Sequence, residues 1–183
     1  PTCGGDANFA TAMKRMRRLR ASISNQDSIK RFSRLGVDVY LGQARFIGSD
    51  KIEVDGRRLR FRRAVIATGA RAVVPAIPGL EEVDYLTNET IFSLTELPAR
   101  LGVIGGGPIG CEMAQSWARF GSQVTLFDMA DHVLPREDPD AAGVVQESLA
   151  SDGVELILKA RINAIGAAGN AKLVRYELDD GVA

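Results

Sequence analysis

Three glycines, Gly105, Gly107 and Gly110, have the spacing of a phosphate-binding turn, G-x-G-x-x-G, within "LGVIGGGPIGCEMAQSWARFGSQVTLFD" (101–128). In this pattern the first glycine permits a sharp turn from strand to helix. The second lets a pyrophosphate approach the backbone, and the third lets the helix pack closely on the strand. The helix N-terminus then presents unpaired amides and a partial positive charge to the phosphates. The stretch therefore predicts a dinucleotide site.

Asp128 supplies the second part of this pattern. It ends the strand predicted over 123–127, about 20 residues after the first glycine, where an acid accepts hydrogen bonds from the adenosine ribose hydroxyls and repels a 2′-phosphate. No arginine occurs in the following seven residues, "MADHVLP". The sequence thus predicts NAD(H) rather than NADP(H). A glycine turn that binds nothing is disfavoured, because spacing, predicted elements and acid all agree.

Side chains that could carry out a reaction are scarce. Cys3 and Cys111 lie far apart and match no metal or redox spacing, and His132 is the single histidine. A zinc site would need unusual ligands, so no metal site is predicted. We expect Cys111 to pack inside a helix and His132 to serve a surface or loop-packing role, since it has no acid/base partner. Nothing near Cys3 would activate its thiol.

The elements that must position this turn follow from the hydrophobic pattern. Apolar residues at helical intervals predict a helix from Asn8, which caps it, to Gly36, which stops it, with a polar break at 24–27. Pro75, Pro78 and Pro98 bracket a connector with one short helix near 88–94. After the β–α–β unit of the glycine motif, Asp138 and Pro139 predict the start of a second helix. Strands are predicted over 37–42, 44–48, 51–56 and 58–69, the middle three as a meander and "AVIATG" as a buried strand, and over 154–158, 161–165 and 172–180.

Composition places limits on the partners. The 183 residues are 45% hydrophobic and carry 23 basic and 23 acidic side chains, so no global field favours a nucleic acid or an anionic membrane. The basic runs at 14–20 and 57–63 are interpreted as a solvated helix face and a half-exposed strand. No apolar run approaches the length of about 20 residues that spans a bilayer. A cytoplasmic protein is expected, with neither a nucleic acid nor a membrane as partner.

Three segments taken together, "AVIATGARAVVPAIPG", a connector ending "SLTELP", and the 101–128 stretch, resemble the FAD-dependent pyridine nucleotide–disulfide oxidoreductases. "GGGPIGCE" and "VLPRED" are most similar to the mercuric reductase and dihydrolipoamide dehydrogenase branch. The resemblance implies an α/β fold: a Rossmann-like, three-layer NAD-binding domain with parallel sheet and β-meander, preceded by part of an FAD-binding domain. Residues 1–75 would be the latter part of the FAD domain, with the long helix, the meander and the ATG strand. Residues 76–183 would be the NAD(P) domain, lacking its last strand.

The resemblance also assigns residues to the two cofactors. Gln43 and Ala44 match backbone contacts to the FAD adenine, and the Ala67–Thr68–Gly69 segment would pass by the FAD. On the NAD side, Glu112 matches a glutamate near the nicotinamide–flavin junction and Ile162 an apolar residue that packs on the adenine. Pro108 stands where the family often has an aromatic gate, so a tyrosine-type gate is absent. With Ile109, the predicted NAD contacts are Gly105, Gly107, Pro108, Ile109, Gly110, Glu112, Asp128 and Ile162.

The family's first glycine fingerprint, its Cys-x4-Cys disulfide with a nearby lysine, and its C-terminal His–Glu pair are not in this sequence. We therefore expect a central fragment of a flavoenzyme, inactive alone. The whole enzyme, a homodimer, would pass a hydride from NAD(P)H to FAD and on to a disulfide, small thiol or metal-ion acceptor. Three alternatives stay open: a stand-alone NAD-binding module without flavin, a single-domain dehydrogenase, for which no Tyr-x3-Lys is found, and a structural protein that interacts through the basic helix.

Overall fold

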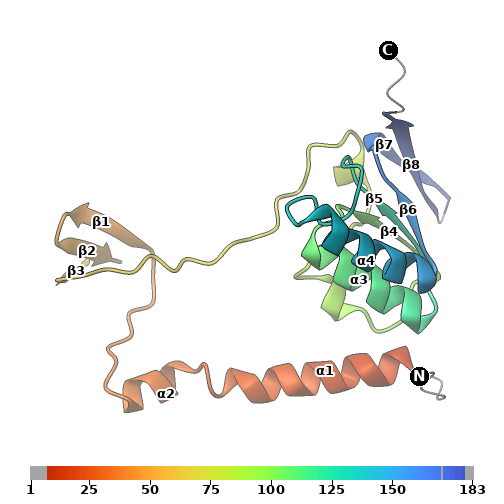
Figure 1. The fold of residues 1–183 in the computed structure, drawn as a ribbon. Helices are drawn as coiled ribbons and strands as arrows, with labels where there is room; N and C mark the ends of the chain where they lie inside the picture. Colours follow the sequence, from red (N-terminus) through yellow and green to blue (C-terminus); the bar gives the residue numbers. More distant parts are fainter. Residues whose placement is uncertain (1–7, 170, 180–183) are drawn as a thin grey trace. The chain divides into compact units, whose positions relative to one another are not determined.

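The chain divides into two compact units in the computed structural model, which describes residues 8–169 and 171–179. One unit consists of Pro1–Lys14 with Ala72–Ala183, and the other of Arg15–Arg71. Figure 1 colours both along the sequence. Within the described ranges, no helix combines the length and apolar content needed to cross a bilayer.

The predicted long helix is present and divided at the predicted polar break. Asn8 caps it through a side-chain oxygen that accepts the N–H of Thr11 at 2.9 Å. Ser28 restarts the helix in the same way, accepting the N–H of Arg31 at 3.3 Å. Gly36 adopts a left-handed φ of 84°, which stops the second segment. The two helices are α1 (Phe9–Ser24) and α2 (Ile29–Arg34).

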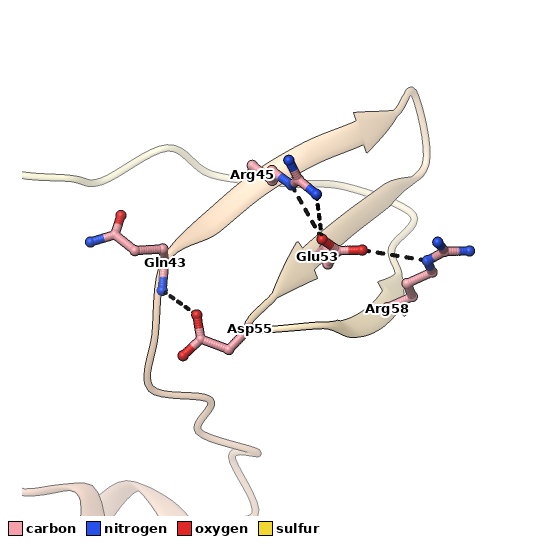
Figure 2. Close-up of polar contacts among 5 residues, drawn as sticks. All are labelled: Gln43, Arg45, Glu53, Asp55 and Arg58. Atoms are coloured by element: carbon pink, nitrogen blue, oxygen red, sulfur yellow. Dashed lines mark hydrogen bonds and ion pairs between the residues drawn. The ribbon is translucent and has the colours of Figure 1, made fainter.

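The predicted meander is also confirmed, as a three-stranded antiparallel sheet in the order β1-β2-β3. Its register places Arg45, Glu53 and Arg58 side by side on one face. Figure 2 shows both guanidinium groups reaching the Glu53 carboxylate, at 2.7 Å from Arg45 and 3.5 Å from Arg58. The hydrogen bond from Arg45 is the main cause that lowers the pKa of Glu53. The strands are β1 (Ala44–Gly48), β2 (Lys51–Val54) and β3 (Arg57–Arg60).

Two strand predictions in this unit are wrong. Residues 37–42 form no strand, and the strand predicted over 58–69 ends at Arg60, so "AVIATG" and its ATG segment are irregular. Val65 is 90% exposed and Ile66 73%, which is the opposite of the predicted burial. The physical reason is that a strand requires a hydrogen-bonded neighbour: β1 pairs with β2 and β2 with β3, and no other described strand joins this sheet.

The glycine motif lies in a parallel α/β arrangement, as predicted. The strands pair in the order β4-β5-β6, and the helices of the β–α–β–α–β path both contact this sheet (Figure 1). Asp138 caps the second helix by accepting the N–H of Asp140, and Pro139 is its first residue, as predicted. The elements are β4 (Arg100–Ile104), α3 (Pro108–Phe120), β5 (Gln123–Phe127), α4 (Pro139–Ser151) and β6 (Val154–Ile157).

An antiparallel hairpin forms the third layer. It consists of β7 (Ala160–Ala168) and β8 (Ala171–Leu178). Val103 lies beneath the position of Gly110 in α3, and its register partner Leu126 shares that face of the sheet. Because side chains alternate along a strand, Phe127 faces the other way. There it meets Tyr176 of β8 edge-on, with ring centroids 5.4 Å apart. The three-layer prediction is therefore confirmed.

The connector before β4 is packed rather than extended. Leu80 and Ile91 are buried, each within a short 3-10 turn, η1 (Leu80–Glu82) and η2 (Ile91–Ser93). The predicted helix near 88–94 is thus only the single turn η2. The N–H of Ile165 in β7 donates to the carbonyl of Pro78 at 2.8 Å. A side chain at Gly79 would overlap the Ile165 carbonyl, so the connector and hairpin touch backbone to backbone.

Candidate dinucleotide site

The three glycines of the motif differ in what surrounds them. Gly105 has a φ of 104°, a left-handed conformation that turns the chain from β4 toward α3. A methyl group at Gly110 would overlap the carbonyl oxygen of Gly105, so this glycine is required for close packing of the helix on the turn. A methyl group at Gly107 would meet no atom of the chain within 4 Å. Packing within the chain gives no reason for a glycine there, whereas the approach of a phosphate does.

The N-terminus of α3 offers backbone donors at the same place. Gly107 is the N-cap in extended conformation, with no side-chain cap, and Pro108 occupies the first helical turn. Pro108 lacks an N–H, so the donors of this turn are the amides of Gly107, Ile109 and Gly110. Ile109 is 54% exposed beside them, an apolar surface for a cofactor ring. The residues present fit the pyrophosphate of a dinucleotide.

Asp128 lies next to the turn, where the sequence predicts it. One carboxylate oxygen accepts the N–H of Gly106 at 2.5 Å, and the other accepts the N–H of Ala130 at 2.7 Å. A carboxylate has about four lone-pair positions, so both oxygens retain capacity for ribose hydroxyls. The structure thus brings together the turn and the acid, the two parts of the predicted NAD site.

Gly106, which lies between Gly105 and Gly107, makes contacts that the sequence did not predict. The Gly106 carbonyl accepts the N–H of Leu134 at 2.7 Å and the thiol of Cys111 at 3.3 Å. Leu134 has a φ of 54°, uncommon for a residue with a side chain. The only available signal was the "VLPRED" resemblance, and it does not encode this backbone conformation.

The structure places Cys111 and His132 where the sequence predicts them, inside a helix and in a loop. Cys111 is buried, and burial is the main cause that raises the pKa of its thiol, followed by the charge of Asp128. His132 contacts its own loop, with Nδ1 2.7 Å from the carbonyl of Val133. Cys3 lies outside the described residues. In the described part of the chain, no group of three His, Cys, Asp or Glu side chains could hold a metal ion.

A groove of about 270 Å³ lies beside the turn, between α3, α4 and the loop after β5. Pro108 and Glu112 line it from α3, Leu134 from the loop, and Val145 and Leu149 from α4. Glu112 is exposed, and none of the ion pairs among described residues includes it. Ile162 lies in β7, opposite Tyr176 of β8 in the hairpin register.

The residues matched to FAD fit that cofactor less completely. The backbone N–H of Gln43 already donates to Asp55 at 3.1 Å (Figure 2), and Ala44 begins β1 at the edge of the meander. Ala67, Thr68 and Gly69 lie in the irregular exposed segment, and no strand pairing joins them to β1. The structure therefore does not assemble a flavin site from these five residues.

The fold and this turn define a class: dinucleotide-binding α/β domains of the Rossmann type. The particular family is given by comparison with known proteins. The pyridine nucleotide-disulphide oxidoreductase family matches residues 5–183, and the chain belongs to that family.

Individual relatives agree with this assignment. The chain is 32% identical over 178 residues to a mercuric reductase of Bacillus cereus, covering 97% of this chain and 28% of that protein. It is 35% identical to the probable pyridine nucleotide-disulfide oxidoreductase RclA of Escherichia coli, covering 93% of this chain and 40% of RclA. The chain thus spans well under half of these relatives.

Solved structures show the same similarity. A Cu(II) complex of the flavoprotein disulfide reductase RclA from Escherichia coli matches with a TM-score of 0.77 at 33% identity, covering 92% of this chain and 41% of that one. LpdA from Mycobacterium tuberculosis matches with a TM-score of 0.77 at 30% identity, covering 94% and 40%. The Rossmann-type fold predicted from the sequence is confirmed.

Proposed function

We propose that this chain is the NAD-binding part, with an adjoining part of the FAD domain, of a flavin-dependent reductase. The observation that carries the proposal is the open position at Gly107, flanked by helix amides and by the Asp128 carboxylate. The amides bind and orient the pyrophosphate, and Asp128 accepts the adenosine ribose hydroxyls. A bound FAD would accept the hydride from NADH and pass electrons to a disulfide, small thiol or metal ion.

Other parts of the proposal extend to the whole enzyme. We propose residues 1–75 and 76–183 as the FAD and NAD portions, Ile109 and Glu112 as the side chains nearest the nicotinamide, and Ile162 as an adenine contact. Gln43, Ala44 and Ala67–Gly69 are proposed to contact FAD once the rest of its domain is present. The proposed setting is a cytoplasmic homodimer. The isolated chain, with two cysteines and no Cys-x4-Cys, is expected not to turn over.

Nucleotide titration tests the NAD part of the proposal. Trp117 in α3 is the single tryptophan of the chain, so energy transfer from it to a bound reduced nicotinamide reports binding. NADH is expected to bind saturably, and more tightly than NADPH, because the 2′-phosphate would face the Asp128 carboxylate. Absence of NADH binding would contradict the proposal of a dinucleotide site. Equal or tighter NADPH binding would contradict the role of Asp128.

A second candidate is a stand-alone NAD-binding module without flavin chemistry. The observation that favours it is the hydrogen bond from Gln43 to Asp55, which occupies a donor expected to face FAD. Visible absorbance and added FAD separate the two candidates. Bound flavin in the purified chain, or saturable FAD binding that Ala44→Pro weakens, would exclude the flavin-free module. NADH binding with no FAD uptake, even after the chain is joined to the missing part of the FAD domain, would favour it.

A further inference from the structure

Both backbone polar groups of Gly106, which lies between Gly105 and Gly107, are hydrogen-bonded. Its N–H donates to Asp128 at 2.5 Å, and its carbonyl accepts both the N–H of Leu134 and the Cys111 thiol. Gly106 is buried, and its two polar groups are therefore both committed inside the protein. Neither the N–H nor the carbonyl of Gly106 is therefore available to bind a ligand. Their partners instead fix how the neighbouring peptide units are oriented.

The segment that provides two of these partners is itself firmly held. Asp128 caps the N–H of Ala130 with its second oxygen, and the Ala130 carbonyl accepts the N–H of Lys159 at 2.8 Å. Val133 is fully buried, and its N–H donates to the Gln146 side chain of α4 at 3.3 Å. The loop from 128 to 134 is thus anchored at both ends and in the middle, and it can hold the turn in place.

Leu134 indicates that this contact is specific. A left-handed φ is unfavourable for a leucine and is maintained only where surrounding contacts require it. Here that conformation accompanies a 2.7 Å hydrogen bond from its N–H to the Gly106 carbonyl. The loop therefore contacts both polar groups of Gly106. The Asp128 carboxylate accepts its N–H, and the Leu134 N–H donates to its carbonyl.

We propose that Asp128 is a positioning residue for the phosphate subsite as well as a ribose ligand. With the Leu134 N–H, it holds Gly106 so that the amides of Gly107, Ile109 and Gly110 converge on the pyrophosphate. The ribose and phosphate subsites are then coupled through one carboxylate. This inference rests on the proposed NAD site and adds a consequence: a substitution at 128 alone cannot convert the chain to NADPH, because it also loosens the turn.

A ligand without ribose hydroxyls separates positioning from direct contact. The probe is NADH whose adenosine ribose lacks both hydroxyls, titrated against the chain and its Asp128→Asn variant. We expect the variant to bind this probe at least tenfold more weakly, and NADPH more weakly as well. Asp131→Asn is the matched control, because it removes the same charge from an exposed position of the same loop, and it should change neither affinity. Unchanged probe affinity in Asp128→Asn would overturn the proposal.

A measurement without nucleotide keeps this outcome distinct from failure of the NAD site itself. Hydrogen exchange at the Gly106 and Leu134 amides should be slow in the original chain and in Asp131→Asn. It should accelerate at both amides in Asp128→Asn, while the amides of α4 stay protected. Exchange that is equally slow in Asp128→Asn would overturn the positioning role, whether or not NADH binds. Slow exchange that is lost in Asp128→Asn, together with no NADH binding to the original chain, would support the positioning role of Asp128 and refute only the proposed function.

Discussion

Alanine at Gly107 should weaken cofactor binding with little effect on stability, whereas alanine at Gly110 should lower stability first. At Gly107 the backbone is extended, with φ −72° and ψ 179°, and a methyl group meets no protein atom within 4 Å. We expect the free energy of unfolding to change by no more than about 0.5 kcal/mol. The methyl group lies where the pyrophosphate must approach, so the Kd for NADH should rise at least tenfold, or about 1.4 kcal/mol.

At Gly110 the same methyl group overlaps the Gly105 carbonyl, which is backbone and cannot rotate away. Overpacking of this kind costs roughly 1–3 kcal/mol. In a domain of about 100 residues each kcal/mol lowers the Tm by about 4–8 °C. Gly110→Ala should therefore be seen first in thermal unfolding, and it weakens NADH binding by displacing the turn.

Gly143→Ala is the matched control, because Gly143 lies within α4 and also has no atom near its methyl position. It should stabilise the helix slightly and leave NADH binding unchanged. The assays are thermal unfolding and NADH titration by energy transfer from Trp117. Normal NADH binding by Gly107→Ala would refute the inferred approach of the phosphate. A loss of Tm in Gly107→Ala equal to that of Gly110→Ala would show that both glycines serve packing alone.

Three more predictions follow from contacts of the same unit. Hydrogen bonds from Arg119, and secondarily Gln115, lower the pKa of Asp152. The contribution of Asp152 to stability is therefore present above the usual aspartate pKa and is lost as pH falls through the lowered value. Asp152→Asn should flatten the acid side of a Tm-against-pH curve, and an unchanged curve would contradict this. Phe9 meets Trp117 and Phe120 edge-on, with ring centroids 5.9 and 5.4 Å apart. Phe9→Ala should lower the free energy of unfolding by about 3 kcal/mol in denaturant and shift Trp117 emission to the red. Unaltered emission would show that the contact does not form. Burial raises the pKa of the Cys111 thiol, so in a Cys3→Ser background a thiol reagent at pH 7 should react only after unfolding, and rapid labelling of the folded protein would contradict the buried position.

Local signals predicted much of this structure correctly. The caps at Asn8 and Asp138 and the stop at Gly36 depend on residues a few positions apart, so they can be read without knowledge of the fold. The glycine turn and Asp128 were predicted for the same reason, because their spacing encodes a single β–α–β unit.

Features that depend on distant partners were not predictable in this way. "AVIATG" has the composition of a buried strand, yet Val65 and Ile66 are exposed because no neighbouring strand pairs with them. Leu134 gives no sign in its residue type of a left-handed conformation, which is imposed by contact with Gly106. Apolar composition indicates that a segment can form a buried strand, and the presence of a neighbouring strand decides whether it does.

The hydrogen bond between Pro78 and Ile165 also constrains the order of folding. It closes a long loop that contains the entire parallel sheet, so it contributes a contact of high sequence separation, which slows folding. During synthesis the connector cannot dock on β7 until that strand has left the ribosome. Leu80 and Ile91 of the connector are buried in the finished unit. We therefore expect nascent chains that end before residue 165 to be those most prone to aggregate and most dependent on chaperones.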